Sequence, residues 1–295
     1  MKKHYLKTVA SYALIVVFLV YILFPVSWLF LMSIKTPAEN LLMPPRFPFE
    51  PTIANYLNSW FGSATVWYTA FGRATEKVTV TTVYGASLAI RNTLVIASAS
   101  TLAALASGIP AAYSFSRFKM KRREDLQFYI LAQRMAPPIA VIVPFFALSR
   151  WAGLSNTHLG IVLAHLVFNL PLATWLMKGF IDEIPKEIDE SAWLDGCSTL
   201  GIIWRIILPL AKPGITAVAI LCFLFSWNEF LFASILSGPD TLTMTVLMTQ
   251  YFVHFTVDWG SLAATIMLGL IPTIILVMIL QRYLIQGLTF GAVKG

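Results

Sequence analysis

Six long apolar stretches, separated by polar segments, dominate this sequence. An α-helix needs about 20 apolar residues to cross the hydrocarbon core of a membrane. The pattern therefore predicts an all-α integral membrane protein with six transmembrane helices. The second predicted span is rich in Ala, Ser and Gly, which permits close helix–helix approach, and Pro137 and Pro138 are expected to break the third. The predicted spans are Val9–Ile34, Asn92–Phe115, Leu126–Leu148, Leu159–Phe180, Gly214–Leu236 and Gly260–Leu280.

The polar segments divide the chain into four parts. Lys35–Arg91 is rich in proline, asparagine and aromatic residues, and Val78–Val83 has the β-branched composition of a strand. We expect an extracytoplasmic loop or cap in this part of the chain. The predicted parts are an N-terminal transmembrane helix (1–35), the extracytoplasmic loop (36–91), a core of five spans (92–282) and a cytoplasmic tail (283–295).

Composition and charge support this topology. The chain is 58% hydrophobic and only 12% charged, whereas soluble domains average about 25% charged residues, so lipid must cover much of its surface. The net charge of +7 is not arranged for nucleic acid, because its one dense basic cluster lies between two spans. Cytoplasmic loops carry such an excess of Lys and Arg, which predicts that both termini lie inside. The cluster is Arg117, Lys119, Lys121, Arg122 and Arg123.

A polar stretch, residues 183–214, interrupts the spans on the predicted cytoplasmic side. Pro185 suits the first turn of a helix, and Gly196 is a natural stop. Ser198 or Thr199 can cap a second short helix that ends near Pro209. We therefore expect a helix–turn–helix at the membrane surface, and its position makes it accessible to another protein.

This stretch resembles the coupling loop of ABC importer permeases. The resemblance is carried by Glu190-Ser191-Ala192, by Gly196 and by Ile207-Leu208-Pro209, with Ser191 in place of the first alanine of the family motif. Further similarity, to the maltose-transporter type of carbohydrate permease, runs from about Ala86 to Arg282 and includes Trp227-Asn228-Glu229-Phe230. The stretch Gly62–Gly85 looks like an insertion relative to that family.

The resemblance implies a permease subunit of a bacterial ABC importer, a multi-pass protein of the inner membrane that is not itself an enzyme. Its implied partners are a second permease subunit, two cytoplasmic ATPase subunits, an extracytoplasmic solute-binding protein, the lipid bilayer and a sugar-like substrate. No GxxxxGK[ST] phosphate loop is present, so ATP and Mg²⁺ are expected on the ATPase subunits and no cofactor on this chain. The implied ATPase-coupling residues are Glu187, Glu190, Ser191, Ala192, Leu194, Asp195 and Gly196.

Polar side chains inside the predicted spans are candidates for the substrate pathway. Such groups are costly in lipid and should face the interior of the bundle or a wet cavity. Amide, carboxylate and indole groups together suit a sugar, but a purely structural role in joining helices is an equal alternative. Arg134 is expected to pair with Glu229 or with a backbone carbonyl. The pathway candidates are Gln133, Asn169, Trp227, Asn228 and Glu229.

Two other function classes compete with this interpretation. A stand-alone secondary transporter or channel for a small polar solute would need ion-coupling groups within the membrane, and only Arg134 and Glu229 are plausible charges there. An intramembrane enzyme would need a nucleophile or a metal site, and neither a GxSxG motif nor a metal-ligand spacing of His or Cys is present. The ABC importer permease is therefore the main hypothesis.

Overall fold

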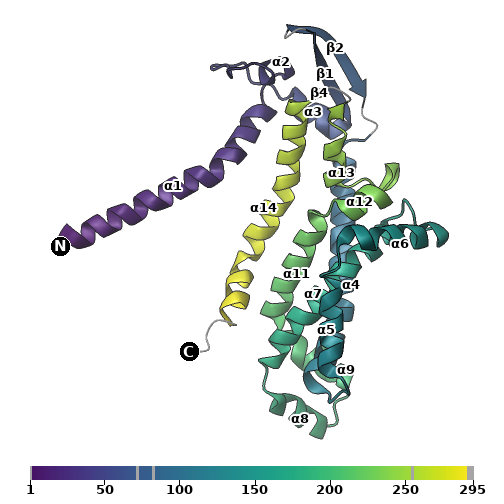
Figure 1. Cartoon of the computed structure of the whole chain (residues 1–295). Helices are drawn as coiled ribbons and strands as arrows, with labels where there is room; N and C mark the ends of the chain where they lie inside the picture. The colour runs from purple at the N-terminus through teal and green to yellow at the C-terminus, as the bar shows by residue number, and fades with distance from the viewer. Residues whose placement is uncertain (1, 71–72, 82–83, 254–255, 291–295) are drawn as a thin grey trace. The chain divides into compact units, whose positions relative to one another are not determined.

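The computed structural model describes residues 2–70, 73–81, 84–253 and 256–290. The chain is divided into two compact units, residues 1–87 with 247–271 and residues 88–246 with 272–295. The helices α4 and α14 each contribute to both units, so each unit is described separately (Figure 1).

The first unit contains the first apolar helix and the segment after it. Its elements are α1 (Lys2–Ser33), α2 (Pro37–Asn40), α3 (Ala54–Phe61), β1 (Ser63–Ala70), β2 (Arg73–Thr81), β3 (Phe252–Val253), β4 (Thr256–Val257) and the first part of α14 (Trp259–Phe290). The strands β1 and β2 pair antiparallel, with a register shift at Tyr68/Thr69. This hairpin occupies the expected insertion, and Val78–Thr81 forms the end of β2, whereas Thr82 and Val83 lie outside the described residues. The designation all-α therefore applies to the spans and not to this segment.

Local capping determines where the short elements of the first unit begin and end. The Thr36 hydroxyl accepts from the backbone N–H of Glu39, while a carboxylate oxygen of Glu39 accepts from the Thr36 N–H at 3.1 Å. This reciprocal pair is a capping box at the start of α2. Gly62 ends α3 with φ = 84°, a left-handed conformation that glycine adopts without a steric penalty.

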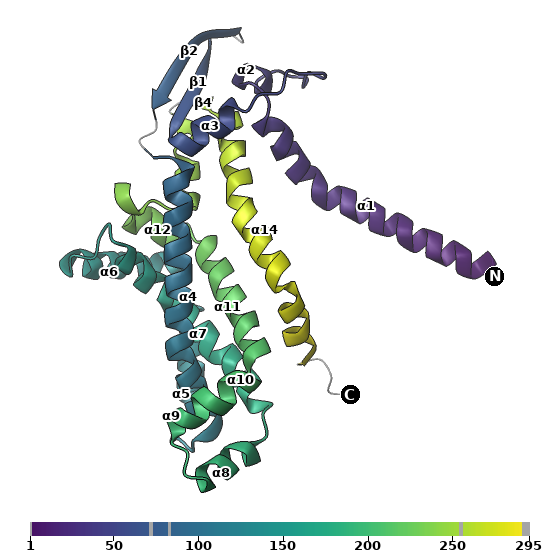
Figure 2. The ribbon, with the colours of Figure 1, turned by 180° about the vertical axis from the view of Figure 1, so that it is seen from behind.

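The second unit is a helical bundle. Its elements are α4 (Ala86–Arg117), α5 (Arg123–Gln133), α6 (Pro138–Trp151), α7 (His158–Asp182), α8 (Lys186–Leu194), α9 (Thr199–Ile202), the π-helix η1 (Ile203–Ile207), α10 (Leu208–Leu210), α11 (Lys212–Trp227), α12 (Leu231–Leu236), the 3₁₀-helix η2 (Pro239–Thr241), α13 (Met244–Thr249) and the last part of α14. The core lies between α4, α7 and α11, and it extends to η1 and α8. Figure 2 shows α9 and α10 at the end of this bundle that carries α8.

Small residues let the long helices approach closely, as the Ala, Ser and Gly content of the second predicted span indicated. A Cβ atom on Gly108 of α4 would lie 3.0 Å from the Ala173 Cβ atom of α7. A Cβ atom on Gly214 of α11 would lie 2.4 Å from the ring of Phe180. The backbones of α4 and α11 therefore contact α7 at positions where no larger residue fits.

Four helices in the described part of the chain are long and apolar enough to cross a membrane, or six if each of two sharply bent helix pairs counts as one span. One such pair is α5 with α6, bent by 87° at the break that contains Pro137. This confirms the predicted disruption of the third span, because a proline has no N–H to continue the helix and disfavours helical geometry in the residue before it.

The fifth predicted span differs from the structure. The helix α11 ends at Trp227 rather than continuing to Leu236, and the short helix α12 follows after a break. At its other end α11 meets the α9–α10 segment at an 84° bend. Asn228 and Glu229 therefore lie between two helices, and their N–H groups donate to the Leu224 and Ser226 carbonyls at 3.1 and 3.4 Å.

Candidate functional site

The predicted helix–turn–helix forms at residues 185–210. Pro185 precedes α8, and Gly196 follows it with φ = 81°. The Gly196 N–H donates to the Trp193 carbonyl and the Cys197 N–H donates to the Ala192 carbonyl, each at 3.0 Å, which is the Schellman pattern of a glycine-terminated helix. The Ser198 hydroxyl then caps α9 by accepting from the Gly201 N–H at 3.2 Å. Of the two predicted caps, Ser198 is the one used.

The inner side of α8 is attached to α4 by a buried ion pair. The Arg117 guanidinium donates to the Asp189 carboxylate, and both side chains are nearly inaccessible, with 2% and 1% of their surface exposed. Arg117 also donates to the Ile184 carbonyl at 2.8 Å. Beside it, the Ser116 hydroxyl donates to Asp182 at 2.6 Å. The end of α4 therefore holds both the entry to α8 and the helix itself.

Ala192 also lies on the inner side of α8. It is buried in the core cluster that contains Ile202 and Ile207. Ala192, one of the implied coupling residues, is therefore not exposed to a partner in this structure, because the helix turns it toward the core of its own chain. Ala192 positions α8 and does not belong to its outer surface.

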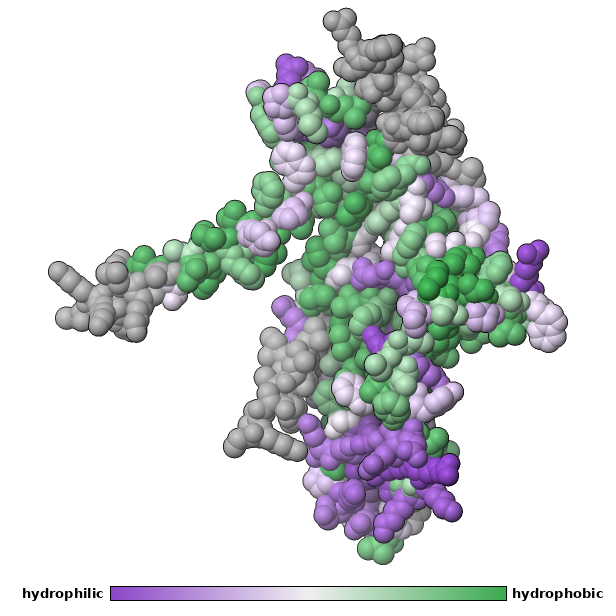
Figure 3. Space-filling view, viewed as in Figure 1, coloured by the Kyte–Doolittle hydropathy of each residue, from purple (hydrophilic) through white to green (hydrophobic). Residues whose placement is uncertain are grey.

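The other predicted coupling residues lie on the outer surface of α8 or just after it, and we call this set the outer face of α8. Leu194 has 89% of its surface accessible. Trp193 and, from the following segment, Leu200 and Trp204 add further exposed apolar area. Hydrophilic residues gather around this end of the bundle (Figure 3). An apolar residue surrounded by charges is typical of a protein contact. The outer face comprises Glu187, Glu190, Ser191, Leu194, Asp195 and Gly196.

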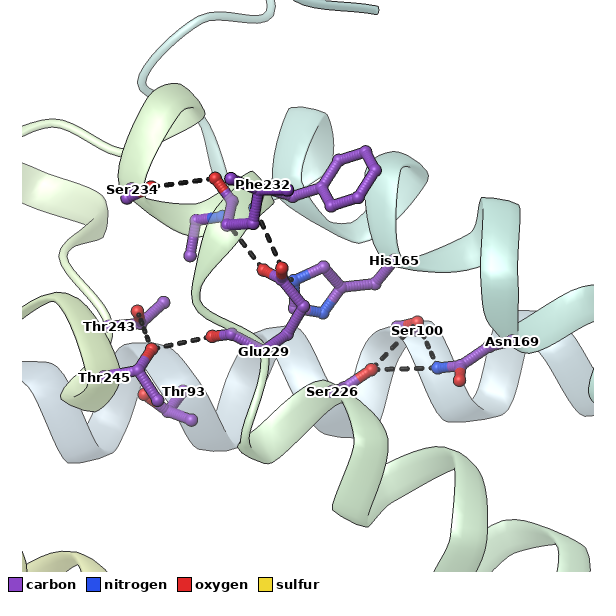
Figure 4. Close-up of polar contacts among 12 residues, drawn as sticks. Thr93, Ser100, His165, Asn169, Ser226, Glu229, Phe232, Ser234, Thr243 and Thr245 are labelled. Carbon is purple, nitrogen blue, oxygen red and sulfur yellow. Dashed lines mark hydrogen bonds and ion pairs between the residues drawn. The ribbon is translucent and has the colours of Figure 1, made fainter. Parts of the chain in front are cut away.

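The break after α11 is held together by Glu229. Its carboxylate accepts from the backbone N–H groups of Phe232 and Ala233 at 2.9 and 3.0 Å, so it caps α12. The Nε2 atom of His165 on α7 lies 3.3 Å from the same carboxylate. The Thr245 hydroxyl donates to the Glu229 carbonyl at 2.7 Å (Figure 4). Glu229 thus joins three segments of the bundle and has a structural role.

Asn169 occupies the centre of the bundle. It is fully buried, and its amide nitrogen donates to Ser226 at 2.9 Å, to Ser100 at 3.1 Å and to the Cys222 carbonyl at 3.2 Å (Figure 4). These contacts link α7 to α4 and α11. Asn169 is therefore closed off from solvent, which favours the structural alternative over direct contact with a substrate.

The other three pathway candidates do not share a site with Asn169 and Glu229. Trp227 is buried and its ring stacks on that of Phe223, with 5.7 Å between the centroids. Asn228 is exposed and donates to the Leu224 carbonyl of its own helix at 2.8 Å. Gln133 is exposed at the end of α5. The structure therefore places Asn169 and Glu229 among the polar contacts that join segments of the bundle. It leaves Gln133 and Asn228 at the surface.

Arg134 was expected to pair with Glu229 or with a backbone carbonyl. Its guanidinium donates to the Phe168 carbonyl at 3.1 Å and lies over the ring of Phe225, 4.5 Å from the centroid. The carbonyl alternative is therefore confirmed, and the carboxylate of Glu229 pairs with His165 instead.

Five residues that build these sites could not be recognised as site residues from the sequence alone. They are Ser100, Ser226, His165, Arg117 and Asp189. Arg117 was visible only as one of five basic residues in a loop, and Asp189 only as one of three acidic residues in a helix. Nothing in the local sequence distinguishes either residue from its neighbours.

A substitution at Asn169 tests the structural role of this residue. Asn169→Leu should lower the thermal midpoint of the purified protein, because it removes the interhelical hydrogen bonds of the Asn169 amide group, and such bonds are each worth about 0.6 kcal/mol in membrane proteins. Asn228→Leu is the matched control, because Asn228 bonds only within its own helix. A thermal scan in detergent measures both variants, and equal midpoints would contradict the assignment.

Comparison with known proteins places the chain among transport components. The family described as "Binding-protein-dependent transport system inner membrane component" matches residues 104–290. The inner membrane ABC transporter permease protein YcjP of Escherichia coli is 30% identical over 99% of both chains. The sulfoquinovosyl glycerol transport system permease protein SmoH of Agrobacterium fabrum is 30% identical, over 92% of this chain and 89% of the relative.

Solved structures share the fold. A bacterial ABC transporter involved in the import of the acidic polysaccharide alginate contains a chain with a TM-score of 0.72 and 22% identity, and the match covers 96% of this chain and 98% of that one. The MetNI methionine ABC transporter contains a chain with a TM-score of 0.55 and 15% identity, covering 68% of this chain and 94% of that one. Because transporters of a polysaccharide and of an amino acid both share it, this fold does not select a substrate.

Proposed function

Because this chain belongs to the family of binding-protein-dependent transport system inner membrane components, we propose that it is the permease subunit of an ABC importer for a sugar or sugar derivative. The observation that carries the proposal is the family match over residues 104–290. Its members are transport components of the inner membrane rather than enzymes. Multiple apolar helices in the described part of the chain agree with that location.

The relatives support the carbohydrate class. The names of three of them refer to transport of sulfoquinovosyl glycerol, galactooligosaccharides and trehalose. Each relative matches 92% or more of this chain, so the similarity includes the spans as well as the coupling segment. The substrate class follows from these relatives and not from polar groups in the bundle, because Asn169 and Glu229 are already engaged within the chain.

In the proposed importer, α8 is a cytoplasmic coupling helix that contacts an ATPase subunit through its outer face. An exposed leucine surrounded by carboxylates suits a groove with an apolar floor and a basic rim. When ATP binding closes the ATPase dimer, the movement of α8 reaches α4 through Arg117 and Asp189, and the bundle changes between outward-open and inward-open states. The six-span topology with both termini inside is part of this proposal.

The proposed assembly contains a second permease, two ATPase subunits and an extracytoplasmic binding protein. The alginate importer structure supports these partners, since a related structure was solved with a pentasaccharide-bound periplasmic protein. ATP and Mg²⁺ would be held by the ATPase subunits. This chain would supply the pathway and the coupling surface.

Reconstitution tests the proposal. The chain, its partner permease, the ATPase and the binding protein are placed in vesicles, and uptake of a labelled sugar is measured with ATP on the ATPase side. Uptake should require all of these components as well as ATP hydrolysis. If the chain alone takes up solute at the same rate, the alternative of a stand-alone secondary transporter or channel is correct.

A further inference from the structure

A cavity of about 370 Å³ lies in the first unit at the end of α1. Its walls come from three separate segments. The last turns of α1 supply Trp28, Leu31 and Met32, the loop after α2 supplies Leu42 and Met43, and the start of α14 supplies Trp259. The volume lies in the range of about 300–1,000 Å³ that ligand cavities in proteins occupy.

The polar groups in the wall of this cavity are already engaged within the chain. Asn40 donates from its amide nitrogen to the Met32 carbonyl at 3.0 Å. The Lys35 ammonium lies 4.1 Å from the centroid of the Phe47 ring and 4.7 Å from that of Phe49. It also donates to the Arg46 carbonyl at 3.5 Å. None of these groups needs a ligand to satisfy it.

The third polar group, Glu39, is satisfied as well. Its carboxylate accepts from Thr36 and from the backbone N–H of Glu50. Burial raises the pKa of Glu39, but these hydrogen bonds outweigh it, so the pKa lies below its ordinary value and the group stays ionised. A sugar, which is recognised through several hydrogen bonds to its hydroxyl groups, would find few free partners here.

Several apolar residues of the wall are exposed. Met43 has 95% of its surface accessible, and Leu42, Trp28 and Trp259 are exposed as well. Contiguous apolar surface of this kind marks a binding site for protein, ligand or membrane. The exposed apolar wall of this cavity therefore suits an apolar partner.

The position of the cavity along α1 indicates which apolar partner this is. Residues 11–33 form one of the candidate membrane spans, and the hydrophobic window of this span has 0% of its residues buried within the protein. Trp28, Leu31 and Met32 belong to the last turns of that span, where a transmembrane helix reaches the boundary between hydrocarbon and headgroups. Tryptophan is enriched at this depth, and two tryptophans, Trp28 and Trp259, line the cavity. The cavity thus opens where lipid acyl chains begin.

We propose that this cavity binds an acyl chain of a phospholipid from the leaflet at which α1 ends. The proposed topology makes this the extracytoplasmic leaflet. Leu42 and Met43 then insert beside the chain at the membrane surface, and Trp28 and Trp259 flank it. The inference depends on α1 spanning the membrane and is independent of the substrate that the importer carries.

Photolabelling of the assembled transporter tests this site. Vesicles contain a phospholipid with a diazirine on its acyl chain, and the labelled residues are mapped by mass spectrometry after illumination. Label should appear on Trp28, Leu31 and Met32 and on residues 41–43, which line the cavity. Leu31→Trp fills the cavity and should lower the labelling about tenfold, the change produced by a loss of about 1.4 kcal/mol in binding. Leu29→Trp is the matched control, because Leu29 lies on the same helix but not in the cavity wall, and its labelling should equal the wild type.

A second variant guards against misfolding of Leu31→Trp. Met43→Asp places a charge at an almost fully exposed position, so the fold should be unaffected while labelling of Trp28, Leu31 and Met32 falls. Equal labelling in the wild type and in both cavity variants would overturn the proposal. So would a crosslink from benzoylphenylalanine at residue 42 to the binding protein or the second permease in place of lipid, because a protein would then occupy the cavity.

Sugar uptake by the same vesicles separates this proposal from the proposed function. Labelling without any ATP-driven uptake would leave the lipid site intact and count against the importer assignment. ATP-driven uptake without labelling would support the importer assignment and count against the lipid site.

Discussion

Replacing Asp189 with alanine is expected to abolish most of the ATP-driven uptake by the reconstituted importer. The variant leaves the Arg117 guanidinium buried without its carboxylate, and breaking a buried ion pair from one side costs about 3–5 kcal/mol. The guanidinium can regain solvation only if α8 moves away from α4. We therefore expect a lower thermal midpoint, and at temperatures where the protein is still folded we expect ATP hydrolysis without matching uptake.

The double variant Arg117→Leu/Asp189→Leu is the control for this prediction. Replacing both partners of a buried pair with apolar residues is often neutral, so stability should largely return. Uptake should return as well if packing between α4 and α8 is sufficient for coupling. A single variant Asp189→Ala with the uptake and the midpoint of the wild type would contradict the coupling role of the pair.

Replacing Gly196 with valine is expected to uncouple ATP hydrolysis from transport. Gly196 has φ = 81°, and for a residue with a Cβ atom a left-handed conformation costs about 1–2 kcal/mol, more for a β-branched residue. The two hydrogen bonds that end α8 depend on this conformation. Valine should therefore unravel the end of the helix and displace Leu194 from its position on the outer face. The measurement is the ratio of sugar transported to ATP hydrolysed.

A second substitution at the same position separates two explanations. Among the described residues, apart from Gly196 and its two chain neighbours, no atom lies within 4 Å of a Cβ atom built on Gly196, so a clash with the rest of the fold does not contribute. Asparagine tolerates the left-handed conformation but adds a side chain toward the partner. If Gly196→Asn couples normally, glycine is needed for the backbone; if it fails as valine does, the ATPase needs the space. Normal coupling in Gly196→Val would show that α8 is not the coupling helix.

Much of the local structure was predictable from short stretches of sequence. Apolar length predicted the helical spans, Pro137 predicted the break between α5 and α6, and Pro185 and Gly196 predicted the two ends of α8. These features depend on backbone preferences and on residues within a few positions of one another. Val78–Thr81, the described part of the predicted β-branched run, lies in β2 and belongs to the same group.

The roles of the polar residues were not predictable in this way. Whether Ala192 faces a partner or its own core depends on which side of α8 packs against the bundle, and the helical period alone leaves both sides possible. Glu229 could equally have met Arg134, a substrate or a helix end, and the break after α11 brings it to the N–H groups of α12.

Sequence alone thus established a membrane protein of several helical spans, the limits of its surface helix–turn–helix and, through the motif within it, a resemblance to importer permeases. The folded chain alone revealed the pairing of Arg117 with Asp189 and the buried contacts of Asn169. The physical reason is distance along the chain. Arg117 and Asp189 are 72 positions apart, and Asn169 and Ser100 are 69 apart, so each pair meets only after several helices have packed together.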